Sequence, residues 1–176
     1  MSNRIKASIF FLVAIIIGFF SFQYFITSND SGKSSNTNNL LPKFSFYTLD
    51  NQEFRNKDIA KKHYVLFIYF NTQCDHCYYQ AEDIKDNIES LHDVQILFTS
   101  NDVIENIKIF ASEVELENEP NVQFLSDPTK SYYDLFEPGI IPNIFVYDKS
   151  HKLLEHFEGQ TEVKNILSIL DASVMI

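Results

Sequence analysis

The two cysteines of this chain follow a run of buried-type residues, and this pattern constrains the fold more than any other feature. Residues 65–70 (VLFIYF) are a continuous apolar run of strand length, as expected for a central strand covered on both faces. The motif Cys74-Asp75-His76-Cys77 comes next, and it opens a stripe of residues at helical spacing, Cys77, Ala81, Ile84, Ile88 and Leu91. We therefore expect a buried strand, a short loop, and a helix with Cys74 at its N-terminus.

The number and spacing of the cysteines favour a reactive pair over structural disulfides. The chain has only two cysteines, with two residues between them, whereas a disulfide scaffold needs several well-separated pairs. Inert packing cysteines usually stand alone within apolar runs, and Asp75 and His76 between this pair make such a role a poor fit. The pair is therefore the first candidate for a functional site.

The rest of the chain predicts an α/β fold in which a central mixed sheet is flanked by helices. The expected strands are an opening hairpin at 44–49 and 53–55, inner strands at 94–99 and 122–125, and a late hairpin at 144–147 and 153–157. The expected helices span 103–114, 129–136 and 163–170, and residues 100–102 (Ser-Asn-Asp) offer capping groups for the first of them. Strands that alternate with helices pair in parallel, and the late hairpin adds antiparallel strands.

The N-terminal part predicts a single membrane anchor. Residues 7–26 carry no charge and supply about the 20 apolar residues that a bilayer-spanning helix needs. Arg4 and Lys6 precede them, and positive flanks stay in the cytoplasm. We expect a cytoplasmic tip (1–6), a transmembrane signal anchor (7–26), a flexible linker (27–39), and a folded domain (40–176) that is periplasmic or extracellular. A cleaved signal peptide is the alternative, although the apolar stretch exceeds the usual length of one.

The charge of the chain argues against nucleic acid as a partner. The net charge is −10, and Arg4 and Lys6 are the only charged residues before Asp30, so the part from there onward carries −12. Such a surface repels phosphate groups.

The order of motifs resembles the thioredoxin superfamily. Gly139-Ile140-Ile141-Pro142 and the residues up to Asp148 look like the G-x-x-P-x-x-F-x-x-D segment of its TlpA/ResA-like, AhpC/TSA-related branch, and residues 41–54 resemble the N-terminal hairpin of that branch. Many members are membrane-anchored thiol-disulfide oxidoreductases. The resemblance implies a thioredoxin-like fold with an N-terminal hairpin extension, and a cis Pro142 beside the disulfide.

Disulfide exchange assigns each of these residues a role. We expect Cys74 to be the nucleophile, with a pKa lowered into the range of about 3.5–7.5 by the helix N-terminus, and Cys77 to resolve the mixed disulfide, the two forming a redox-active disulfide. Asp75 and His76 would tune the pKa of Cys74 in opposite directions.

Ile141 and Pro142 would bind the substrate, with the backbone of Ile141 presented to an extended strand. The expected partners are protein thiols and disulfides, and a membrane electron donor or acceptor is a candidate partner. No cofactor and no metal is required, and the direction of electron flow stays open.

Three positions depart from the family pattern. Gln73 replaces the usual Trp before the first cysteine, and Gln80 replaces an acid often found three residues after the second. Ile68 stands near the place of a buried acid. Proton transfer at Cys77 therefore lacks its usual partner.

Two other classes of function remain open at this stage. Cys74, His76 and Cys77 are ligands that suit copper, as in a copper-binding chaperone. A non-catalytic thioredoxin-like interaction module with vestigial cysteines is the second alternative. A peroxidase is less well supported, because residues 72–74 miss the P-x-x-x-T-x-x-C pattern of peroxiredoxins.

Overall fold

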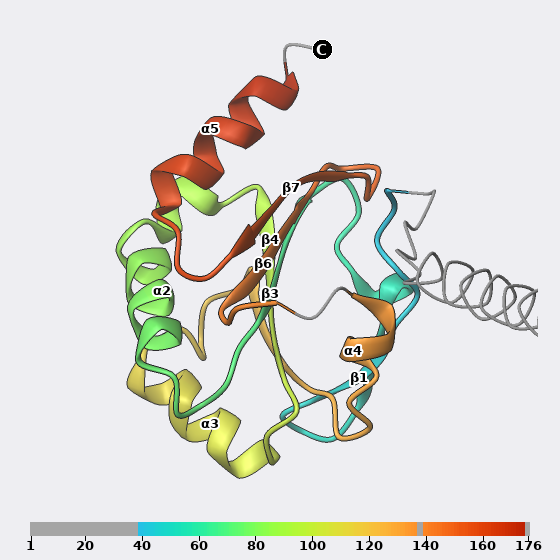
Figure 1. Ribbon diagram of the computed structural model, residues 1–176, viewed down its shortest axis with the longest axis vertical. Coiled ribbons are helices and arrows are strands. Elements are labelled where there is room, and N and C mark those ends of the chain that lie inside the picture. Colours follow the sequence, from blue (N-terminus) through green and yellow to red (C-terminus); the bar gives the residue numbers. More distant parts are fainter. Residues whose placement is uncertain (1–38, 137–138, 175–176) are drawn as a thin grey trace, which may run out of the picture. The chain divides into compact units, whose positions relative to one another are not determined.

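A computed structural model describes residues 39–136 and 139–174 (Figure 1). The predicted anchor at 7–26 and all but the last residue of the predicted linker lie outside these ranges, so their structure stays a prediction. Within the described ranges, no helix combines the length and apolar character needed to cross a bilayer.

The core of the fold is a seven-stranded mixed sheet with the order β2-β1-β5-β4-β3-β6-β7. Its strands are β1 (Ser45–Thr48), β2 (Glu53–Arg55), β3 (Tyr64–Tyr69), β4 (Val94–Ser100), β5 (Val122–Ser126), β6 (Asn143–Tyr147) and β7 (Leu153–Glu158). The three inner strands β3, β4 and β5 run parallel, and β1 and β6 pair antiparallel on either side of them. The predicted mixed sheet and both predicted hairpins are confirmed.

The position of β3 explains why its sequence is apolar throughout. Every residue of this strand is buried, because β4 and β6 pair with its edges while helices and the N-terminal hairpin region cover its faces. Its last residue, Tyr69, pairs with Asn143 at the start of β6. The segment that follows Tyr69 therefore starts beside Pro142, which immediately precedes Asn143.

Helices cover both faces of the sheet, and Figure 1 shows α2 and α3 on one side and α4 on the other. The helices are α2 (Asp75–Asp86), α3 (Ile104–Glu113), α4 (Tyr132–Leu135) and α5 (Val163–Val174), with short 3-10 turns at Asn56–Asp58 and Ile88–Leu91. One apolar cluster joins α2, α3 and α5 to the alternate β3 residues Leu66 and Ile68. A second joins the opening hairpin and α4 to Phe67 and Tyr69 on the opposite face.

Two local expectations differ from the structure. The apolar stripe that starts at Cys77 does not form one helix, because Asn87 ends α2 by donating through its side chain to Asp83, and a 3-10 turn follows. Residues 100–102 were expected to cap the next helix, but its N-cap is Val103, without a side-chain cap. The carboxylate of Asp102 accepts hydrogen bonds from Thr72 instead.

Candidate active site

Cys74 lies where the loop after β3 turns into α2. It is the N-cap residue of that helix, with extended backbone angles, and its carbonyl oxygen accepts the N–H groups of Cys77 (2.9 Å) and Tyr78 (3.2 Å). Its side chain is half-buried. The predicted place of Cys74 at the N-terminus of the helix is confirmed. Its role as the nucleophile stays a prediction.

Cys77 lies one turn further along α2 and is only 1% exposed. Burial, together with a hydrogen bond to the Cys74 thiol, raises the pKa of Cys77, while the backbone N–H of Asn71 acts in the opposite direction. Both cysteines are free thiols in this structure. The two sulfurs thus differ in access: one reaches the surface, and the other is held behind it.

The loop before Cys74 is fixed by hydrogen bonds that the sequence did not reveal. The carboxylate of Asp102 accepts the backbone N–H (3.0 Å) and the hydroxyl (2.7 Å) of Thr72. Asn71 accepts the N–H of Cys74 on its carbonyl oxygen and the N–H of Gln73 on its side chain. The hydroxyl of Ser126 in turn donates to the carbonyl oxygen of Asp102. These bonds tie the approach to Cys74 to the ends of β4 and β5.

Asp75 and His76 are exposed on the first turn of α2. Asp75 is an acidic residue in the first turn of the helix, where a negative charge stabilises the helix. His76 approaches Gln160, with 3.3 Å between its Nδ1 and Oε1 of the glutamine. Their expected effects on the reactivity of Cys74 stay predictions.

The segment before β6 contains the other predicted site residues. The peptide bond between Ile141 and Pro142 is cis, the conformation that the family resemblance implies. Pro142 is buried, Ile141 is half-buried and touches both apolar clusters, and Ile140 is 66% exposed. This loop lies near the dithiol, because Gly159 bonds to it while the next residue, Gln160, contacts His76. Its role in binding substrate stays a prediction.

A metal centre was the main alternative for Cys74, His76 and Cys77. Across the residues that the structure describes, no three His, Cys, Asp or Glu side chains are grouped so that they could hold a metal ion.

Comparisons with known proteins place this geometry in context. The sequence matches the AhpC/TSA family over residues 37–156. No curated protein matches the chain.

Solved structures with thioredoxin-like folds resemble the chain over most of its length. A thioredoxin-like protein from Aeropyrum pernix is 17% identical, with 74% of this chain and 89% of that chain covered and a TM-score of 0.61. The peroxidoxin BcpB of Mycobacterium tuberculosis is 15% identical, with 77% and 96% covered and a TM-score of 0.65. A secreted disulfide oxidoreductase of M. tuberculosis, homologous to DsbE of E. coli, is 13% identical, with 73% and 95% covered and a TM-score of 0.62. At these identities the likeness shows the fold alone.

Proposed function

This chain belongs to the AhpC/TSA family, and from that premise and the geometry of its two thiols we propose that it is an extracytoplasmic thiol-disulfide oxidoreductase acting on proteins. The observation that carries the proposal is the unequal exposure of the pair. Cys74 is half-buried at a helix N-terminus, whereas Cys77 is 1% exposed one turn later. A dithiol relay needs one accessible thiol that attacks the substrate disulfide and one shielded thiol that then resolves the mixed disulfide.

The reaction proceeds in two exchanges when the chain acts as a reductant. The Cys74 thiolate attacks a sulfur of the substrate disulfide; the new bond joins Cys74 to the substrate, and the other substrate sulfur leaves as a thiolate. The thiol of Cys77 then gives its proton to water and attacks the Cys74 sulfur, which releases the second substrate thiolate. The substrate gains two electrons and the chain ends as the Cys74–Cys77 disulfide. Oxidation of a substrate dithiol is the reverse sequence.

Residues around the pair support each step. The amide groups at the start of α2 stabilise the thiolate of Cys74, which is the attacking group in the reductant direction and the leaving group of the last exchange in the reverse direction. The N–H of Asn71 is directed at Cys77 and lowers its pKa, against the effect of burial. A substrate strand would lie along Ile141 and Pro142, whose loop is held near the helix.

The first test is the equilibrium reduction potential of the pair in the full-length chain, titrated in glutathione or dithiothreitol buffers and read by thiol alkylation. A potential of about −250 mV or lower identifies a reductant supplied by a transmembrane donor, and about −120 to −180 mV identifies an oxidant or isomerase. The Cys74→Ser variant is the control that cannot form the disulfide. Failure of the unsubstituted chain to form the disulfide would reject the proposal, and stoichiometric copper binding would then favour the metal-binding alternative.

The extracytoplasmic location is part of the proposal and needs its own test. It is supported by the uncharged residues 7–26 behind Arg4 and Lys6. In intact cells or spheroplasts, a membrane-impermeant maleimide is expected to label Cys74 and to leave a cytosolic control protein unlabelled. Labelling only after the membrane is broken would place the dithiol in the cytoplasm and overturn this part.

A further inference from the structure

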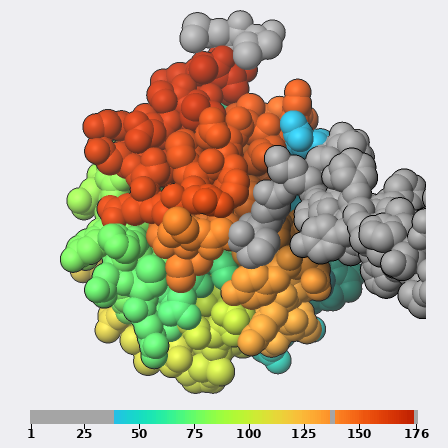
Figure 2. Space-filling view, in the orientation of Figure 1, coloured from blue at the N-terminus to red at the C-terminus, as the bar shows by residue number. Residues whose placement is uncertain are grey.

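The segment of residues 159–163, which connects β7 to α5 and includes the first residue of α5, contacts both parts of the candidate site. Three side chains of α2 bond to it on one side, and the loop that holds Pro142 bonds to it on the other. Figure 2 shows the green surface of α2 and the red surface around the start of α5 adjoining on one face of the molecule.

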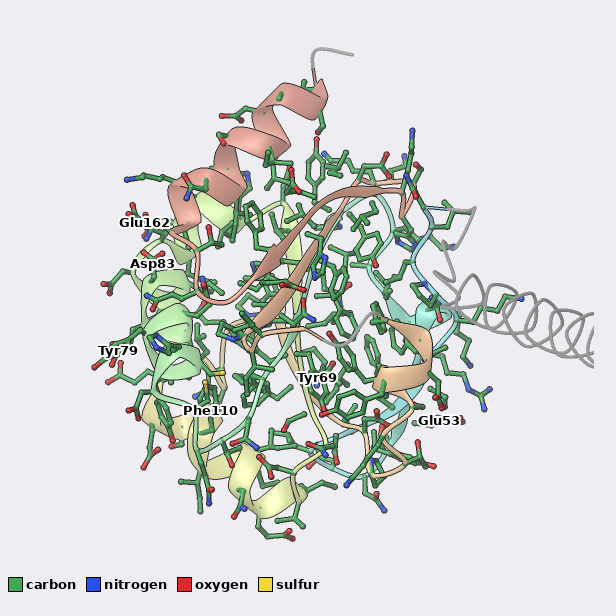
Figure 3. The ribbon with its side chains drawn as sticks, viewed as in Figure 1. Glu53, Tyr69, Tyr79, Asp83, Phe110 and Glu162 are labelled. Atoms are coloured by element: carbon green, nitrogen blue, oxygen red, sulfur yellow. The ribbon has the colours of Figure 1, made fainter. Side chains whose placement is uncertain are left out.

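On the side of α2, the three contacts come from His76, Gln80 and Asp83. Their spacing of four and three residues places them on one face of the helix. His76 meets the side chain of Gln160, Gln80 accepts the N–H of Thr161 at 2.8 Å, and Asp83 accepts the N–H of Val163 at 2.7 Å. Figure 3 shows Asp83 on α2 beside Glu162, the residue that precedes α5. The connection thus runs along the same helix that carries the two cysteines.

On the side of Pro142, the contacts come from Gly159. Its N–H is shared between the carbonyl oxygens of Ile140 (3.1 Å) and Pro142 (2.9 Å), and its φ of +83° is one that side-chain-bearing residues rarely adopt. The loop is also packed closely against the end of β7, because a Cβ on Gly139 would lie 2.6 Å from Oε1 of Glu158. The position of this loop is therefore set by residues 158–159.

Gln80 is the central contact and the only fully buried one of the three. Its side chain is 0% exposed, whereas His76 is exposed and Asp83 is half-buried. Its Oε1 binds Thr161, and its Nε2 has no partner among the residues that the structure describes. A buried amide with an unpaired donor is costly to fold, and an apolar side chain of the same length would avoid that cost. The bond to Thr161 is the contribution that such an apolar side chain could not make.

We propose that Gln80 is a positioning residue that ties α2, and with it Cys74, to the loop at Pro142 through Thr161. A protein substrate contacts both the Cys74 thiol and the loop at Pro142. Its disulfide therefore reacts fast only when the thiol and the loop are held in fixed positions relative to each other. A small disulfide reaches Cys74 without the loop and does not depend on this bond. The inference rests on the proposed function and deepens it: Gln80 gives the chain a preference for protein disulfides over small-molecule disulfides.

The test compares two substrates in single-turnover reactions of the reduced full-length chain. One is insulin, a disulfide-bonded protein, and the other is 5,5′-dithiobis(2-nitrobenzoate), a small aromatic disulfide. In Gln80→Met, which keeps the length of the side chain and removes the acceptor, the rate with insulin is expected to fall about tenfold, as for a modest misplacement of reacting groups. The rate with the small disulfide is expected to stay within about twofold, and the pH profile of Cys74 alkylation to stay unchanged.

Two further variants separate positioning from folding. Gln95→Met makes the same change at the far end of β4, where Gln95 also accepts a backbone N–H, that of Ala60. It is expected to leave the ratio of the two rates unchanged. Gln80→Glu keeps an acceptor for Thr161 and is expected to restore the ratio toward that of the unsubstituted chain.

Each outcome bears on the proposal. A ratio in Gln80→Met equal to that of the unsubstituted chain would overturn it, as would an equal fall of the ratio in Gln95→Met. A fall with both substrates alike would make Gln80 a structural residue only. If the unsubstituted chain reacted with neither disulfide, the proposed function and this inference would both be rejected, whereas activity with a changed ratio in Gln80→Met alone supports both.

Discussion

The backbone N–H of Cys77 donates to the carbonyl oxygen of Cys74 at 2.9 Å. This hydrogen bond closes the first turn of α2 and fixes the backbone positions of the two cysteines relative to each other. That turn leaves Cys74 half-buried and places Cys77 among the core residues. Under the proposed function, this difference in exposure assigns the attack on the substrate to Cys74 and the resolving step to Cys77.

Alkylation of the reduced full-length chain is expected to occur mainly at Cys74. At pH 7 and limiting iodoacetamide, Cys74 should be labelled at least about tenfold faster than Cys77, because thiolate character and access control the rate. Burial keeps the pKa of Cys77 above the ordinary thiol value, so this thiol stays protonated at neutral pH. Mass spectrometry of the peptide that contains residues 74–77 gives the ratio.

The Cys74→Ser variant provides the control for this prediction. In it, labelling of Cys77 should become appreciable only at a pH above about 8.5, the ordinary thiol value, because burial, the main cause of the raised pKa, remains. Rapid labelling of Cys77 at neutral pH in either protein would contradict the structure.

Replacing Asp102 is expected to slow disulfide exchange without touching either cysteine. Asp102→Ala removes the acceptor for two donors of Thr72 and frees the loop that leads to Cys74. We expect a loss of about 3 kcal/mol in the free energy of unfolding, since two hydrogen bonds to a charged group are lost and each contributes at least about 1.5 kcal/mol. We also expect a several-fold lower rate with insulin. Urea unfolding and single-turnover kinetics measure the two effects.

Asp58→Ala is the matched control for Asp102. Asp58 also accepts a backbone N–H through its carboxylate, that of Arg55, but it belongs to the opening hairpin region. Its loss should lower stability slightly and leave the exchange rate unchanged. Equal slowing in both variants would show that Asp102 acts through general stability only.

The contact between Tyr78 and Glu113 gives a pH dependence with a definite sign. Burial, and then the hydrogen bond that the phenol donates to Glu113 at 2.6 Å, raise the pKa of Tyr78 from 10.0 to about 12. The raised pKa favours the neutral phenol, so the stability that this contact adds between α2 and α3 is fully present below pH 10. It is lost as the pH rises from 10 toward 12.

The Glu113→Gln variant tests this assignment. The neutral amide still accepts a hydrogen bond but adds no charge, so the pKa of Tyr78 should fall part of the way toward 10, with burial preventing a full return. NMR titration of tyrosines labelled at Cζ, with Tyr78→Phe to identify the signal, measures the shift. An unchanged pKa in Glu113→Gln would mean that burial alone sets it.

The sequence identifies the parts of the site that are local in the chain. Cys74 and Cys77 are recognisable because a buried strand and an amphipathic stripe flank them, and Pro142 because a strand follows it within a family-like segment. The structure places these parts in one region by pairing Tyr69 with Asn143.

The supporting residues could not be predicted, because their contacts are remote in sequence. Asp102 meets Thr72 across 30 positions, and Gln80 meets Thr161 across 81. Neither pair repeats with a helical or strand period, so periodicity carries no signal for them. The pattern at residues 100–102 indicated that Asp102 caps the following helix, since an Asp just before a helix normally does so. In the structure, Asp102 binds Thr72 instead.

Truncation of Phe70 is expected both to weaken the core and to slow the reaction at Cys74. Phe70 follows β3, is 0% exposed, and packs on the rings of Phe98, Phe110 and Phe124. Phe70→Ala should cost about 3–5 kcal/mol in the free energy of unfolding, the usual range for a buried phenylalanine. Because Phe70 directly precedes Asn71, the cavity should also loosen the loop and slow exchange with insulin at temperatures where the variant stays folded.

Phe46→Ala separates the two effects of that truncation. Phe46 is equally buried but belongs to the cluster on the other face, where it stacks on Phe44. Its truncation should lower stability by a similar amount and leave the exchange rate of the folded protein unchanged. Chemical denaturation and single-turnover kinetics on both variants give the comparison. If Phe46→Ala slowed exchange as much as Phe70→Ala, the link between Phe70 and the loop before Cys74 would be rejected, because a loss of stability anywhere in the core would then suffice.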